Sequence, residues 1–344
     1  MNFLDLLSGA QLGNVPPAKF RCRANYIKTC DLAVTHDKEF STAYFNNVYY
    51  ADVLMNRLLL TTDITQCMMF DLSADHVFSP KTEFWTKNDN SAVGLPCATW
   101  GDNCSFFISS GCGSDIKVHD TETLVIIENF NLDANRYNYR LTTLGHDTSP
   151  FSSNLIAVAS SDGSVPVIDL RTGNIESMAS MYLSDVSSIS WSPFHEHIIA
   201  LTSNDSHSLQ LWDMRHFRQH RTSIRYATRM SPDLQFIDYS TLACQRNASL
   251  DIVDIFKDEV VTQVIIEQTN RYRRKNKFAI NYHSEPKLIY FALGDELAVL
   301  NLKTYSVINS YRESLFPVEI ALFNQSLGEL YTFSDKESII WKQI

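Results

Sequence analysis

The chain offers little that could catalyse a reaction. It contains no Gly-x-Gly-x-x-Gly or P-loop phosphate cradle, no Gly-x-Ser-x-Gly element and no His-Glu-x-x-His zinc motif. The nearest approach to a metal-ligand pair is His195-Glu-His197, which falls at the tip of an expected hairpin, where exposed polar residues are the ordinary choice. We therefore predict no catalytic residue, no metal site and no cofactor, and we expect a binding function.

One short element has the chemistry of an interface contact. An apolar run ends in Trp212-Asp213-Met214-Arg215. A guanidinium is planar and permanently charged, and it presents several donors to a carboxylate or to an array of carbonyls. The pair Asp169-Leu-Arg171 repeats the Asp and the Arg, with Ile168 in place of the Trp. Arg215 and Arg171 are therefore candidate contacts to a protein partner.

Basic residues gather in two stretches. Residues 215–229 and 271–277 hold five Lys or Arg each, ten of the 29 in the chain. The second stretch could contact an acidic protein or a nucleic-acid backbone, and Tyr272 could stack on a base. The plainer alternative is that both stretches are solvated loops. The candidate contact residues of the second stretch are Arg271, Tyr272, Arg273, Arg274, Lys275 and Lys277.

The elements that must position these residues recur seven times. Each unit has an apolar strand, a short polar turn and a second strand that ends in Asp, Asn or Lys. The closing residues are 41 to 49 positions apart, at Asp71, Asp120, Asp169, Asp213, Asp254, Asn301 and Lys342. Because short strands with a period of 40–50 residues are typical of a β-propeller, the sequence predicts seven blades. The recurrent Asp is expected to cap the turn that follows it.

A further strand precedes each pair and completes the inner part of each blade. These inner strands are expected at 42–53, 95–102, 137–144, 186–193, 224–232, 277–283 and 318–324. Outer strands are expected at 124–130, 175–181 and 260–266. Only nine positions separate Arg215 from Ile224, so the outer strand of the fourth blade is expected to be short or irregular. The pair Gly145-His146 is expected to follow an inner strand.

The last unit has three strands, which would leave an exposed sheet edge. The segment 26–34, YIKTCDLAV, precedes the first unit and has no partner of its own. We expect it to supply the missing outer strand. The predicted organisation is an all-β, seven-bladed propeller over 26–344, preceded by a short helix and linker over 1–25.

The first residues carry the spacing of an amphipathic helix. Phe3, Leu6, Leu7 and Ala10 fall at i, i+3, i+4 and i+7, and Pro16-Pro17 ends any continuation. One alternative is a helix that frays or packs on its own propeller. The other is a helix that docks in the groove of a partner. Because a ring closed by 26–34 does not need this helix, we favour the partner.

Composition limits the partners. With a net charge of −10, the chain is a poor candidate for direct, sequence-reading DNA binding. The seven cysteines form no Cys-x-x-Cys, which suggests reduced thiols in the cytosol or nucleus. The first ten residues lack the basic start of a signal peptide, and no run approaches 18 apolar residues. No membrane span is predicted.

Residues 155–215 resemble the third and fourth repeats of the Cockayne syndrome A family of WD40 proteins. The matching runs are LIAVASSDGSVPVIDLRTGNIESM and VSSISWSPFHEHIIALTSNDSHSLQLWDMR. The blocks LLSGAQLG (6–13), DIKVHDTETL (115–124) and ELYTFSDKESIIWK (329–342) are also similar to the family. Four of the seven closing positions, at Asp120, Asp169, Asp254 and Asn301, lack the Trp, Phe or Tyr that WD40 repeats place before the Asp, so the pattern has diverged.

The resemblance implies a substrate receptor of a cullin-4 ubiquitin ligase that acts in transcription-coupled repair in the nucleus. In such receptors a Trp-Asp-x-Arg contacts the ligase adaptor, the large subunit of the UV-damaged-DNA-binding protein, and the N-terminal helix inserts into it. The implied adaptor contacts are Phe3, Leu6, Leu7, Trp212, Asp213, Arg215 and Arg171. The implied client is stalled transcription machinery, RNA polymerase II with the Cockayne syndrome B remodeller, and 271–277 is its candidate contact.

Three alternatives remain open at this stage. Arg215 could form only a surface salt bridge to a neighbouring blade. The chain could serve the same ligase with another client. It could also be a WD40 scaffold in chromatin or RNA processing with no link to a ligase.

Overall fold

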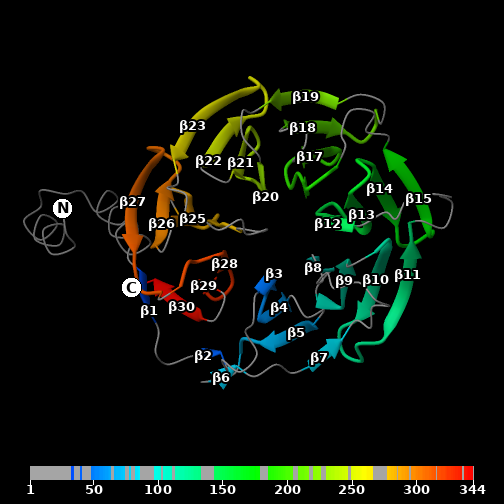
Figure 1. The fold of residues 1–344 in the computed structure, drawn as a ribbon, viewed down its shortest axis with the longest axis horizontal. Helices are drawn as coiled ribbons and strands as arrows, with labels where there is room; N and C mark the ends of the chain where they lie inside the picture. Colours follow the sequence, from blue (N-terminus) through cyan, green and yellow to red (C-terminus); the bar gives the residue numbers. More distant parts are fainter. Residues whose placement is uncertain are drawn as a thin grey trace, which may run out of the picture.

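Short runs rich in β-branched and aromatic residues form seven four-stranded antiparallel sheets, which stand as blades around a ring (Figure 1). The predicted seven-bladed propeller is confirmed. The computed structural model describes residues 32–34, 39–40, 48–62, 66–73, 77–78, 82–85, 97–101, 104–110, 113–132, 143–178, 185–203, 208–216, 220–225, 230–246, 249–265, 277–284, 286–293, 296–314, 316–334 and 337–343. The expected N-terminal helix lies outside them.

The blades follow the order of the chain, with each first strand at the centre of the ring. Blade 1 contains β3 (Val48–Leu54), β4 (Arg57–Thr62), β5 (Gln66–Asp71) and β7 (Thr82–Trp85). Blade 2 contains β8 (Cys97–Trp100), β9 (Phe106–Ser110), β10 (Asp115–Asp120) and β11 (Ile126–Asn131). Blade 3 contains β12 (Thr143–Ser149), β13 (Ser152–Ser160), β14 (Val165–Asp169) and β15 (Asn174–Met178).

The remaining blades continue around the ring in the same way. Blade 4 contains β16 (Ser188–Trp191), β17 (Ile198–Ser203), β18 (Ser208–Asp213) and β19 (His220–Arg225). Blade 5 contains β20 (Met230–Phe236), β21 (Thr241–Arg246), β22 (Ser249–Asp254) and β23 (Glu259–Ile265). Blade 6 contains β24 (Ala279–Asn281), β25 (Leu288–Leu293), β26 (Glu296–Asn301) and β27 (Ser306–Tyr311).

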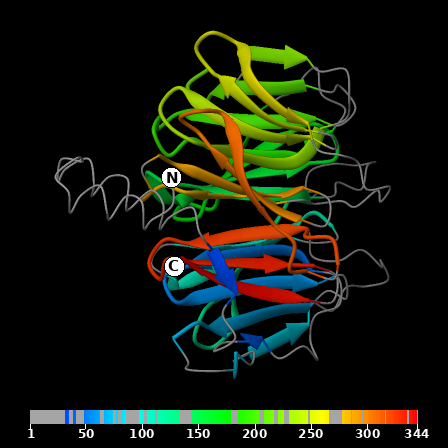
Figure 2. The ribbon, with the colours of Figure 1, turned by 90° about the vertical axis from the view of Figure 1, so that its left-hand side faces the viewer.

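Blade 7 joins the two ends of the chain. It contains β28 (Ile320–Asn324), β29 (Glu329–Phe333), β30 (Ser338–Gln343) and, as its outer strand, β1 (Leu32–Val34). Figure 2 shows β1, in blue, beside β30, in red. The two strands pair antiparallel, with Leu32 opposite Gln343 and Val34 opposite Trp341. The prediction that the N-terminal segment closes the ring is confirmed for its last three residues.

Apolar side chains fill the spaces between adjacent blades. Leu32 is buried with Trp341, Tyr290 and Leu288 between blades 6 and 7, and its N–H donates to the Tyr311 hydroxyl at 3.0 Å. A short parallel pair, β2 (Glu39–Phe40) and β6 (Val77–Phe78), adds a second link. It places the Phe40 ring 5.4 Å from that of Phe70 in blade 1 and 5.7 Å from that of Phe333 in blade 7. Among the described residues, no helix is long and apolar enough to cross a membrane.

Two expectations about strand positions were wrong. Gly145-His146 lies within the inner strand β12, because the His146 ring is buried there between the hydroxyls of Thr99 (2.9 Å) and Ser110 (2.9 Å). The outer strand of blade 4 is the six-residue β19, which is not short but has the expected irregularity, a bulge between Leu211 and Trp212 of its partner strand, and it includes residues 224–225. The inner strand of blade 5 therefore starts later than expected, at Met230.

Ring closure gives a first prediction. Replacing Leu32 with Ala should lower the free energy of unfolding by about 2–4 kcal/mol, because it leaves a cavity beside Trp341 in the strand pair that closes the ring. Urea unfolding monitored by circular dichroism would measure the change. Val125→Ala, on the exposed edge of blade 2, is the control and should stay within about 0.5 kcal/mol of the wild type. An equally small loss for Leu32→Ala would mean that β1 is not needed for closure.

Candidate functional site

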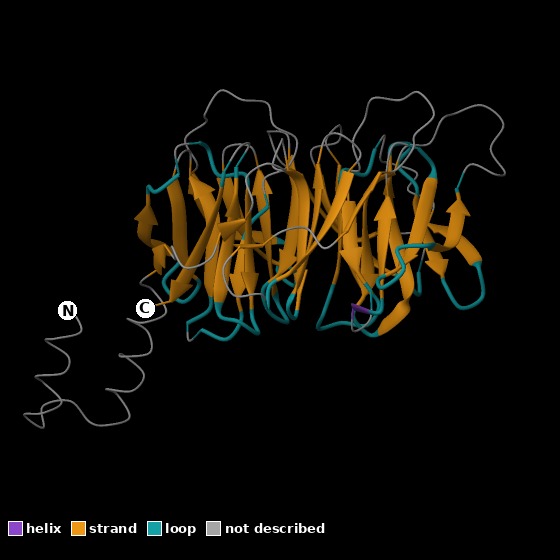
Figure 3. Cartoon of the chain, turned by 90° about the horizontal axis from the view of Figure 1, so that it is seen from below, coloured by secondary structure: helices purple, strands orange, loops and turns teal. Residues whose placement is uncertain are grey.

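Tight turns form one face of the ring, at the lower edge of Figure 3. They join the first to the second strand and the third to the fourth strand of each blade, and we call this surface the turn face. The first-to-second turns are 55–56, 104–105, 150–151, 192–197, 237–240, 282–287 and 325–328, of which residue 285 is not described. The third-to-fourth turns are 72–73, 121–125, 170–173, 214–216, 255–258 and 302–305.

The closing Asp or Asn of six blades caps the third-to-fourth turn, as its recurrence predicted. Its side-chain oxygen accepts a hydrogen bond from a backbone N–H two or three residues later, in the manner of an Asx turn. The oxygen-to-nitrogen distances are 2.9 Å at Ser73, 2.6 Å at Thr123, 2.9 Å at Arg171, 3.0 Å at Arg215, 2.9 Å at Phe256 and 2.8 Å at Lys303.

The guanidinium of Arg215 is exposed and held in one orientation. Asp213 Oδ1 accepts hydrogen bonds from the Arg215 backbone N–H (3.0 Å) and from Nε (2.9 Å), and Oδ2 accepts one from Nη2 (2.7 Å). The hydrogen bond from the Arg215 side chain is the main reason that the pKa of Asp213 falls to about 2. The Arg215 side chain is 62% exposed. Its ion pair is made within its own turn and not with a neighbouring blade.

The other expected adaptor contacts have different surroundings. Trp212 is only 2% exposed and packs with Trp191 and Ile199 between blades 3 and 4. Its indole is therefore part of the core beneath the Arg215 turn and is not itself on the surface. Arg171 is exposed at the corresponding position of blade 3, where its backbone N–H donates a hydrogen bond to the carboxylate of Asp169. Phe3, Leu6 and Leu7 lie outside the described residues.

The hairpin tip of blade 4 supports the Arg215 turn. The N–H of Met214 donates to the carbonyl of His197 at 2.8 Å, which ties the two turns of the blade together. Glu196 and His197 lie 3.7 Å apart, and the Glu196 carbonyl accepts from the Trp191 indole at 3.1 Å. Within the described part of the chain, no group of three His, Cys, Asp or Glu side chains could hold a metal ion.

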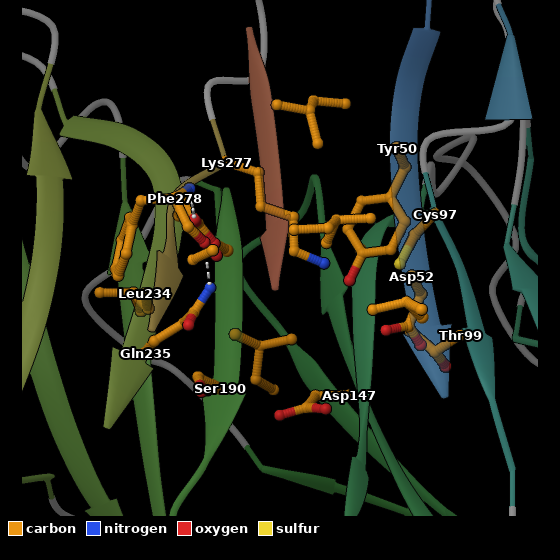
Figure 4. A pocket seen from close by; sticks show the side chains of 18 of the residues that line it. Tyr50, Asp52, Cys97, Thr99, Asp147, Ser190, Leu234, Gln235, Lys277 and Phe278 are labelled. Atoms are coloured by element: carbon orange, nitrogen blue, oxygen red, sulfur yellow. Dashed lines mark hydrogen bonds between the residues drawn. The ribbon is translucent and has the colours of Figure 1, made fainter. Parts of the chain in front are cut away.

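A cavity of about 400 Å³ lies at the centre of the ring, and Figure 4 shows the side chains that line it. Three aspartates on inner strands of blades 1, 3 and 5 face it. Each accepts the backbone N–H of the next inner strand. The pairs are Asp52 with Trp100 (3.0 Å), Asp147 with Trp191 (2.6 Å) and Asp233 with Phe278 (2.8 Å). These carboxylates therefore join blades 1 to 2, 3 to 4 and 5 to 6.

Lys277 is the one described member of the basic stretch 271–277, and it lies in the wall of this cavity. Its ammonium donates to the carbonyl of Ala51 at 2.8 Å and sits 4.2 Å from the centre of the Tyr50 ring. Figure 4 shows the side chain directed into the cavity toward Tyr50. The Lys277 side chain therefore makes its contacts inside the propeller. The sequence analysis expected it to contact a client from an exposed loop, which would need a side chain directed outward. Arg271, Tyr272, Arg273, Arg274 and Lys275 lie outside the described residues.

Burial changes the ionisation of two of these carboxylates. Loss of solvation raises the pKa of Asp233 to about 7, although the Lys277 ammonium and the Phe278 N–H act in the opposite direction. Loss of solvation raises the pKa of Asp147 to about 6, against the N–H groups of Trp191 and Thr148. Sequence reasoning missed these aspartates. Their signal is an Asp inside a β-prone inner strand, at Asp52, Asp147 and Asp233.

No protein-family model matches this chain. The propeller is consistent with a WD40 protein, and such a fold suits a scaffold or a receptor. What the chain binds must therefore be argued from the turn face and from the resemblance of residues 155–215.

The cavity gives a second prediction, for Asp233→Asn. Because the folded-state pKa of Asp233 is raised, its ionisation opposes folding, and the wild-type free energy of unfolding falls as pH rises from about 4 toward 7. The Asn carbonyl can still accept the Phe278 N–H but cannot ionise. The free energy of unfolding of the variant, relative to wild type, should therefore rise by on the order of 1 kcal/mol between pH 5 and pH 8.

Urea unfolding at each pH would measure this difference. Asp120→Asn is the control, because the hydrogen bond from the Thr123 hydroxyl lowers the pKa of Asp120 and keeps it ionised across the range. Its difference from wild type should not change with pH. A constant difference for Asp233→Asn would contradict the assignment.

Proposed function

We propose that this protein is a non-catalytic substrate receptor of a cullin-4 ubiquitin ligase. The observation that carries the proposal is the exposed guanidinium of Arg215, fixed by Asp213 at the end of the only Trp-Asp pair. A fixed arginine loses little conformational entropy on binding and presents donors to a partner carboxylate or carbonyl. Arg171 offers a second guanidinium from the next blade. In this proposal the ligase adaptor, the large subunit of the UV-damaged-DNA-binding protein, docks on the turn face.

The resemblance of residues 155–215 to the Cockayne syndrome A family supports this choice of partner over a scaffold without a ligase. The same resemblance gives the finer proposal, which is a role in transcription-coupled nucleotide excision repair in the nucleus. The client would be RNA polymerase II machinery with the Cockayne syndrome B remodeller. It would bind away from the turn face, since the adaptor occupies that surface.

The adaptor contact can be tested with purified proteins. Arg215→Ala should weaken binding of the adaptor about tenfold or more, because it removes a fixed charged donor from the interface. Leu6→Asp combined with Leu7→Asp should do the same, because both residues lie on the apolar face of the amphipathic helix that the sequence predicts for residues 3–10. Arg312→Ala, an exposed arginine in the connection from blade 6 to blade 7, is the matched control. Isothermal titration calorimetry would measure the affinities, and melting temperatures would confirm folding. Unchanged affinity in both variants would refute the proposed interface.

The client needs a separate experiment. After UV irradiation, complexes captured through the tagged chain should contain the remodeller and RNA polymerase II, identified by mass spectrometry against an unirradiated sample. Recovery of the adaptor without either client would favour a receptor of the same ligase with another client. Absence of the adaptor itself would favour a WD40 scaffold.

A further inference from the structure

The exposed Phe and Tyr side chains of the described residues share one face of the propeller. In the described residues six aromatic side chains are exposed, and all six lie in turns of the turn face. They are Phe151, Phe194, Tyr239, Phe256, Tyr282 and Tyr305. The outer strands expose aliphatic residues instead, such as Ile126 and Ile265. Aromatic residues on the surface are typical of the centres of protein interfaces, because they bury a large area at a small cost in side-chain entropy.

Four of these rings lie in the turns of blades 4, 5 and 6, where Tyr239 and Phe256 contact each other and His195, and where Phe194 and Tyr282 both lie beside the Lys287 ammonium. The His195 ring lies 4.0 Å from that of Tyr239 and 6.0 Å from that of Phe256, measured between centroids, and the Tyr239 and Phe256 rings are 5.7 Å apart. Tyr239 is 60% exposed, Phe256 45%, Tyr282 40% and Phe194 37%. We call Phe194, His195, Tyr239, Phe256 and Tyr282 the aromatic belt.

A single ammonium group joins the two ends of the belt. Lys287 Nζ lies 6.0 Å from the centre of the Phe194 ring in blade 4 and 5.9 Å from that of the Tyr282 ring in blade 6. It donates to the carbonyl of Ile237 in blade 5 at 2.8 Å. The Tyr282 hydroxyl donates to the carbonyl of Phe236 at 2.6 Å. These two bonds fix the Tyr282 ring and the Lys287 ammonium before a partner binds, so these side chains lose little conformational entropy on binding.

The charges of the same turns favour a protein over a nucleic acid. These turns carry Glu196, Asp238 and Asp258 against Lys257 and Lys287, so they do not form the basic surface that a phosphate backbone needs, and the three carboxylates would repel it. The net charge of the whole chain, −10, acts in the same direction. An apolar protein surface does not meet this repulsion. A single carboxylate on it could approach the Lys287 ammonium.

The belt is continuous with the turn that carries Arg215. Residues 194–197 and 214–216 are the two turns of blade 4, joined by the hydrogen bond from Met214 to His197. The charge of Glu196 is close enough to Arg215 to raise the pKa of its guanidinium, after the larger effect of Asp213. A partner that contacts Arg215 therefore meets the belt on the next blade.

We propose that the aromatic belt is the apolar centre of the docking surface for the ligase adaptor, and that a carboxylate of the adaptor pairs with Lys287. The identity of the partner rests on the proposed function, whereas the surface itself is argued from the geometry. In this view Arg215 lies at the rim and the belt, on blades 4 to 6, supplies most of the affinity.

The test is the affinity of the purified adaptor for the full chain and its variants. Tyr239→Ala combined with Phe256→Ala should weaken binding at least about thirtyfold, more than Arg215→Ala does, because both rings lie at the centre. Tyr239→Phe keeps the ring and should keep the affinity. Lys287→Glu should weaken binding and make it less sensitive to salt, since it removes the attraction for a carboxylate. Ile127→Ala combined with Ile265→Ala, on exposed outer strands, is the control and should bind as wild type.

Melting temperatures of all variants separate a folding defect from a lost contact. Wild-type binding with a loss below about threefold for the double aromatic variant would overturn the belt while the proposed function stood. Retained affinity in Lys287→Glu would overturn the carboxylate pairing. No binding by the wild type would refute the proposed function, and with it the choice of the adaptor as the occupant.

Discussion

The pairing of β1 with β30 is the constraint on which the rest of the ring depends. Seven blades filled in order along the chain give the last one three consecutive strands, and a segment from the other end completes it. Three residues, Leu32–Val34, provide that strand. Their hydrogen bonds complete the last sheet, and Leu32 fills the space beside Trp341 between blades 6 and 7. Every other blade can then be built from local contacts.

The same constraint explains the exception among the closing residues. Six blades continue from their third strand into a turn, and each of these turns needs an acceptor for its unpaired backbone N–H groups. Asp or Asn supplies it. The third strand of blade 7 has no such turn, because its outer strand comes from β1. Lys342 stands there instead, 3.8 Å from the carboxylate of Glu329.

The sequence was sufficient for features that repeat and insufficient for features that occur once. The period and the capping Asp are repeated patterns and are confirmed, and the closing segment follows from the strand that the repeat lacks in its last unit and is confirmed for residues 32–34. Blade 4 and blade 5 divide residues 220–236 differently from the expectation, since both halves of that segment have strand propensity and only packing decides the register. Lys277 looked like part of a basic loop, yet its side chain turns into the central cavity toward Ala51 and Tyr50. The aromatic belt draws on three blades and has no signature in any one of them.

The junctions between blades differ in chemistry, and this difference bears on the turn face. Aspartates join blades 1 to 2, 3 to 4 and 5 to 6 through the next inner strand. The buried His146 joins blades 2 and 3 through the Thr99 hydroxyl, and Lys277 joins blade 6 to blades 1 and 7. The junction of blades 4 and 5 is packed with Leu211, Leu234 and other aliphatic residues.

On the turn face this junction is crossed by the rings of His195, Tyr239 and Phe256, which pack against one another at tilted angles. Rings that bridge two blades move as one surface only if the blades beneath them are fixed to each other. The aliphatic packing of blades 4 and 5 supplies that rigidity, since a close-packed core tolerates little displacement. The buried Trp212, on the side of blade 4 toward blade 3, fixes the turn of Arg215 in the same way. The rigidity of the proposed docking surface therefore comes from residues that are buried beneath it.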